Sequence, residues 1–149
     1  MIKESIEQLL KRDVKKLQQE IAAYEDESQM WRTVEGISNS AGNLCLHLIG
    51  NLNTYIGATL GGTDYVRQRE LEFSSKDIPR YLMIENIDKV LVIIDETFEK
   101  ISDEQLQEIY PSEVLGYPMT TLYFLIHLQA HLNYHLGQIN YHRRILSNK

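Results

Sequence analysis

The sequence contains little cysteine and little proline, and each shortage excludes a class of structure. Cys45 is the only cysteine among 149 residues, so the chain forms neither an internal disulfide nor a thiolate-rich metal site. A single thiol also suits a reducing compartment. The only prolines are Pro79, Pro111 and Pro118, which leaves long stretches of the chain free to be helical.

Positive charge and long apolar runs are also scarce. The net charge is −6 and the sequence pI is about 5.3, so we expect no nucleic-acid partner, because phosphate contacts require a basic face. No segment approaches the roughly 20 apolar residues of a membrane span, and the charged N-terminal sequence lacks the apolar run of a signal peptide. We therefore expect a cytoplasmic protein without membrane contact, folded as a single domain over residues 1–149.

Apolar residues recur at three- and four-residue steps along most of the chain, which predicts four long helices. These helices are expected at about residues 2–24, from Ser38 or Ser40 to Leu60, 83–101 and 120–146, with a short helical piece at 102–109. Residues 63–81 show no clear periodicity, so they are predicted to form a long crossover between the second and third helices. The expected fold class is all-α, a four-helix bundle.

Four of the five histidines fall on the last predicted helix, and three of them are spaced four residues apart: His127, His131 and His135. Imidazoles at i and i+4 share a helix face and can reach one metal ion. A heptad-like seam through Phe124 and Leu128 would place His131 and His135 in the core and His127 on its flank. On the second helix, His47 is expected to face the same interior.

The spacing alone leaves alternatives open. A lone buried histidine is usually a neutral core residue, and a pair at i and i+4 often lies on a solvated surface. Spacing also does not decide whether His127 or His131 belongs to the pair. Three histidines on two inward seams favour a metal site, because burying several unpaired imidazoles is costly.

The string HLNYHLGQINYHRR, residues 131–144, resembles the fourth-helix signature of the DinB superfamily. That superfamily includes S-transferases that act on the thiols bacillithiol and mycothiol. The signature has two histidines four residues apart followed by Gly-Gln, and SAGNLCLHLIGNL, residues 40–52, resembles the second-helix segment that carries a third ligand. The resemblance implies an up-down-down-up bundle, homodimers, and a divalent metal held by His47, His131 and His135.

Three histidine ligands leave a coordination position open, as in catalytic zinc sites, and imidazole donors suit zinc or nickel best. Gln138, Asn51 and His127 are the candidate supporting residues, and Gln138 is expected either to hydrogen-bond a ligand or to satisfy a backbone group. The leading hypothesis is a metal-dependent enzyme, either a thiol S-transferase using a small-molecule thiol or a hydrolase. The alternative is a non-catalytic, metal-binding homodimer, because no residue stands out as a general acid or base.

Two further expectations concern the surface. In the crossover, Glu70 and Glu72 could approach the metal end, and Arg67 and Arg69 could receive an anionic substrate. A solvated surface position is the favoured prediction for all four. The first and third helices carry apolar residues beyond one stripe, including Leu9 and the residues 90–94, which predicts a twofold homodimer joined by helix faces. The alternative is that these residues only widen the intramolecular core.

Overall fold

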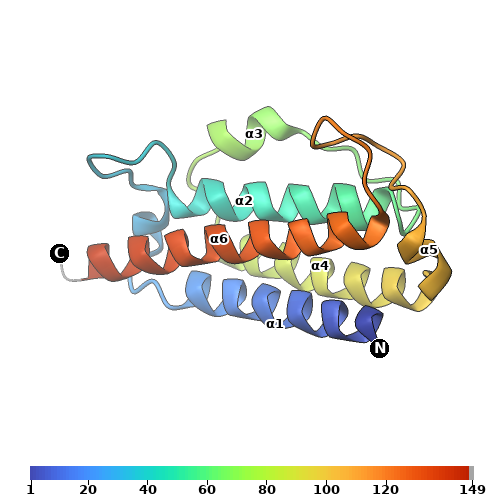
Figure 1. Ribbon diagram of the computed structural model, residues 1–149. Helices are drawn as coiled ribbons and strands as arrows, with labels where there is room; N and C mark the ends of the chain where they lie inside the picture. The colour runs from blue at the N-terminus through green and yellow to red at the C-terminus, as the bar shows by residue number, and fades with distance from the viewer. Residues whose placement is uncertain (148–149) are drawn as a thin grey trace.

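Four long helices dominate the computed structural model, which describes residues 1–147. They are α1 (Ile2–Ala22), α2 (Ala41–Leu52), α4 (Arg80–Lys100) and α6 (Thr121–Ser147). In Figure 1, α2 and α4 run in one direction, whereas α1 and α6 run in the opposite one. Both α1 and α2 pack against α4 and α6, so α1 and α2 lie at diagonal corners of the bundle.

The predicted all-α class is confirmed. Within residues 1–147 there is no β-strand, and Ile109 and Thr120 form only an isolated bridge. None of the helices in this part of the chain is long and apolar enough to cross a membrane.

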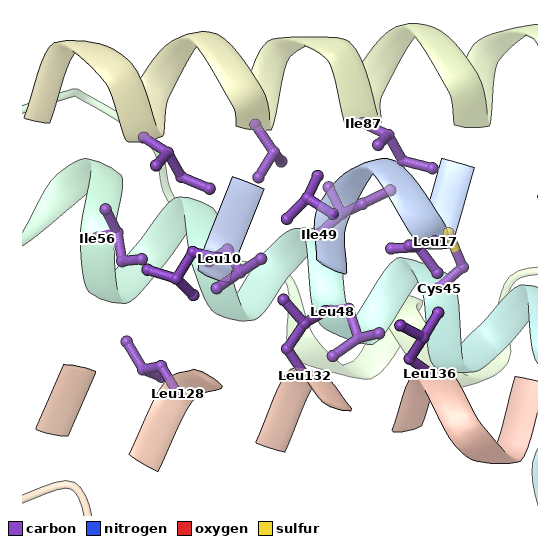
Figure 2. Packing of buried hydrophobic residues seen from close by; sticks show 14 of the residues in the cluster. Leu10, Leu17, Cys45, Leu48, Ile49, Ile56, Ile87, Leu128, Leu132 and Leu136 are labelled. Carbon is purple, nitrogen blue, oxygen red and sulfur yellow. The ribbon is translucent and has the colours of Figure 1, made fainter. Parts of the chain in front are cut away.

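Buried apolar side chains from all four helices form the core, as Figure 2 shows for residues such as Leu10, Leu48, Ile87 and Leu132. The spacing of these residues at three- and four-residue steps is what makes each helix amphipathic. Burying one such side chain fully contributes about 1.5–3 kcal/mol. Cys45 lies in the same core, where burial raises the pKa of its thiol and keeps it protonated.

The connections contain more structure than the sequence predicts. The segment after α1 holds a 3-10 helix, η1 (Glu27–Trp31), and α2 continues into a π-helical stretch, η2 (Asn53–Ala58). The expected crossover contains a short helix, α3 (Arg69–Ser74). The predicted short piece after α4 is α5 (Asp103–Gln107), where Ser102 and Gln105 form a capping box.

The crossover positions α3 against α2, beside which it lies in Figure 1. The buried side chain of Asn43 on α2 donates hydrogen bonds to the carbonyl oxygens of Glu72 (2.9 Å) and Ser75 (2.8 Å). These bonds satisfy backbone groups at the end of a helix too short to be stable alone. These hydrogen bonds fix the position of α3 against α2, next to His47.

Candidate metal centre

The last helix brings His131 and His135 to one face, as their four-residue spacing requires. The predicted seam is correct at Phe124 and Leu128, which are buried, but it is wrong by one position further along, because Leu132 and Leu136 enter the core in place of His131 and His135. Each of the two histidines precedes one of these leucines, so both are half-buried at the edge of the core facing α2. At this edge an imidazole can be held by the protein and still be reached from outside.

His47 meets this pair from α2 and is 8% exposed. Ser40 begins the helix by accepting a hydrogen bond from the backbone N–H of Asn43. The His47 ring lies edge-on to those of His131 and His135, with centroid distances of 5.1 and 5.4 Å. One nitrogen from each of the three rings lies within 4.8 Å of the others, so the three predicted ligands come together.

The donor set suits a divalent cation. The Nε2 atoms of His47 and His131 are 3.2 Å apart, a separation that two ligands of one ion also show when each bonds at roughly 2.0–2.1 Å. The Nδ1 atom of His131 is buried without a hydrogen-bond partner in the part of the chain that the structure describes, which is costly for a polar atom. Three neutral imidazoles at this spacing could hold zinc, nickel or a similar metal.

Glu72 and Arg67 support His47, and the prediction that both are solvated is wrong. Glu72 is 6% exposed, and its Oε1 accepts a hydrogen bond from Nδ1 of His47 at 3.1 Å. Arg67 binds the same carboxylate with two donors, Nε to Oε2 at 2.8 Å and Nη2 to Oε1 at 2.9 Å. Nη2 of Arg67 also lies 3.2 Å from Nδ1 of His47, but Nε and Nη2 of this arginine both bond the carboxylate at shorter distances. Because a carboxylate only accepts, we assign the proton of His47 to Nδ1, which leaves Nε2 with a free lone pair.

Gly50 provides the space that the Glu72 carboxylate occupies. A Cβ atom at this position would lie 2.0 Å from Oε2 of Glu72 and 2.7 Å from its Cδ. The glycine therefore lets α3 bring a charged side chain down to the backbone of α2, one turn from His47. Glu70 and Arg69 are exposed, as predicted for them.

The candidate supporting residues have different surroundings. The Oε1 of Gln138 accepts a hydrogen bond from Nδ1 of His135 at 2.7 Å, which leaves the Nε2 of His135 for a metal. Asn51 is buried one turn beyond His47, and its Oδ1 has no hydrogen-bond partner. His127 stacks between Phe124 and the ring of His131, with centroid distances of 5.8 and 6.3 Å, and is not part of the three-histidine cluster.

His142 belongs to a different part of the molecule. Its Nε2 donates to the carbonyl oxygen of Arg32, and its Nδ1 accepts from the hydroxyl of Tyr24, both at 2.7 Å. These two partners satisfy a neutral imidazole completely. His142 is thus a buried structural histidine that joins α6 to the segment just after α1 and to the segment after η1.

The electrostatics of the cluster favour the neutral, metal-binding form of the histidines. Burial, together with the neighbouring histidines, lowers the pKa of His131 to about 4. Burial also lowers the pKa of His47, although the hydrogen bond to Glu72 opposes this shift. Both rings are therefore unprotonated at neutral pH and can offer a lone pair.

Comparison with known proteins agrees with this architecture. A family model described as "Protein of unknown function (DUF1572)" matches residues 2–149. The chain belongs to the DUF1572 family. No curated protein matches this DUF1572 member.

A solved structure shows the same fold. It is the crystal structure of a DinB-like protein from Bacillus cereus ATCC 10987, with a TM-score of 0.76 over 97% of this chain and 92% of that chain. The two sequences are 19% identical, so this likeness shows the fold alone. The predicted resemblance to the DinB superfamily is therefore confirmed for the fold.

Proposed function

We propose that this protein is a metal-dependent enzyme whose divalent ion is held by His47, His131 and His135. The observation that carries the proposal is the convergence of three imidazoles. Two of them are held in place by hydrogen bonds at Nδ1, His47 by Glu72 and His135 by Gln138. Three protein ligands leave a position open for a substrate, which is the arrangement of catalytic rather than structural zinc. Zinc or nickel is the expected ion.

Within that class, thiol S-transfer fits the surroundings better than hydrolysis. A divalent cation bound there would supply the positive charge that stabilises a thiolate at neutral pH. The Glu72 carboxylate is already engaged by Arg67 and His47, so it is not available to take a proton from water. A thiol needs less help than water, because its ordinary pKa is about 8.5.

The residues of the chain then have separate tasks. Glu72 and Arg67 keep His47 in the tautomer that presents Nε2, and Gln138 does the same for His135. The half-buried position of His131 and His135 keeps the open side of the cluster reachable from outside.

The proposal is tested by removing metal with a chelator, reloading zinc or nickel, and assaying conjugation of low-molecular-weight thiols to 1-chloro-2,4-dinitrobenzene. We expect conjugation that depends on metal and is lost in His135→Ala. Tight metal binding without turnover of any thiol would instead support the alternative, a non-catalytic metal-binding bundle. Absence of metal binding would contradict both.

A further inference from the structure

A cavity of about 570 Å³ opens beside His135, at the end of the bundle where α2 begins and α6 ends. The segment after η1 forms its third side. Its lining is mainly apolar and includes Ile37, Leu44, Tyr141 and Ile145, with His135 and Gln138 on one wall. The volume falls in the range of about 300–1,000 Å³ that small-molecule sites occupy.

Among residues 1–147, no Lys, Arg, Asp or Glu side chain lines this cavity. A second cavity of about 540 Å³, between α2, α4 and the crossover, differs in this respect because Asp64, Glu72 and Lys89 line it. Moving an ionised group from water into an apolar site without a partner is costly. The first cavity therefore discriminates against charged ligands, whereas charged side chains line the second cavity.

His135 connects the uncharged cavity to the metal centre. Its ring lines the cavity and also forms one corner of the cluster, 4.6 Å from the ring of His131 between centroids. A molecule bound in the cavity thus lies against His135, one of the three candidate ligands, with Gln138 beside it. The apolar side chains would contact the body of that molecule.

We infer that this cavity binds the uncharged, apolar body of a neutral thiol whose sulfur reaches the metal centre. The inference rests on the proposed function for the role of the sulfur. The preference for an uncharged body depends only on the lining of the cavity.

The first arm of the test uses metal-free protein and the neutral dye Nile red. Ile145→Glu and Ile37→Glu place a carboxylate on two sides of the cavity, at residues that are 48% and 42% exposed and so tolerate substitution. Ile126→Glu is the matched control, because Ile126 is on the same helix, is 51% exposed and does not line the cavity. We expect both cavity variants to bind the dye at least about tenfold more weakly, and the control to bind it like the unmodified protein.

The second arm uses cobalt-loaded protein, in which thiol binding is followed by visible absorption. Hexanethiol is expected to bind at least about tenfold more tightly than 6-mercaptohexanoate, because only the latter carries a charge into the cavity. Equal affinities, or dye binding that the cavity variants do not weaken, would overturn the inference while leaving the metal centre intact. If cobalt does not bind, the proposed function fails, and the dye arm alone decides for or against an apolar site.

Discussion

Replacement of Gly50 by alanine tests how the metal centre is supported. The added Cβ would lie 2.0 Å from Oε2 of Glu72, whereas real Cβ contacts are essentially never shorter than 3.0 Å. The Glu72 carboxylate must therefore move away by about 1 Å. The side chain has to make this shift, because Asn43 holds the backbone of α3 in place. Such a shift would break the 3.1 Å hydrogen bond to Nδ1 of His47.

Loss of an outer hydrogen bond to a ligand typically lowers metal affinity by about 10–100-fold. We expect a decrease of this size for zinc binding by Gly50→Ala, measured by competition with a chromogenic chelator. Gly137→Ala is the control, because a Cβ there would meet nothing within 4 Å. That variant should keep its affinity and gain up to about 1 kcal/mol in stability from helix propensity. Unchanged zinc affinity in Gly50→Ala would refute the role assigned to Glu72.

Three further predictions concern other features. Glu72→Gln should weaken zinc binding by about 10–100-fold in the same titration, with no change for the exposed neighbour Glu70→Gln; equal effects would contradict the assigned contact. The pKa of His131 is about 6.5 in the unfolded chain and about 4 in the folded protein. The metal-free protein should therefore lose stability as the pH falls from about 6.5 towards about 4, because unfolding then takes up a proton. Urea unfolding at several pH values checks this, and a His131→Gln variant with an equally steep loss would count against it. We also predict a homodimer that uses the exposed side chains of Leu9 and Val92, so light scattering should give twice the monomer mass of 17.4 kDa, and a monomer persisting at high concentration would exclude it.

The long helices could be predicted from the sequence because their stability depends on a local pattern. The stripe through Leu10, Val14 and Leu17 is buried as its periodicity indicates. The short elements could not be predicted in this way. Helix α3 has only six residues, and its position depends on hydrogen bonds from Asn43, which lies far from it in the sequence.

The three histidines and the supporting Gln138 were recognisable from their spacing and from the resemblance, but the support that Glu72 and Arg67 give to His47 was not. On α6, each of the two histidines directly precedes a leucine, so the spacing is compatible with either series in the core. Leu132 and Leu136 are the buried ones, because burying their apolar surface is favourable. Glu72 is buried only because Gly50 leaves room for it and Arg67 neutralises it. These are contacts between segments that are separate in the sequence, so no local pattern in the crossover predicts them.

X-ray absorption spectroscopy of the zinc-loaded protein, together with metal stoichiometry, tests the central claim most directly. The account predicts one zinc per chain with three imidazole nitrogens at roughly 2.0–2.1 Å. His47→Ala, His131→Ala and His135→Ala should each cut zinc affinity sharply, whereas His142→Ala should not, because His142 bonds to Tyr24 and Arg32 instead. Full zinc stoichiometry and unchanged affinity in any of the three variants, or a spectrum without three imidazoles, would contradict the proposed metal centre.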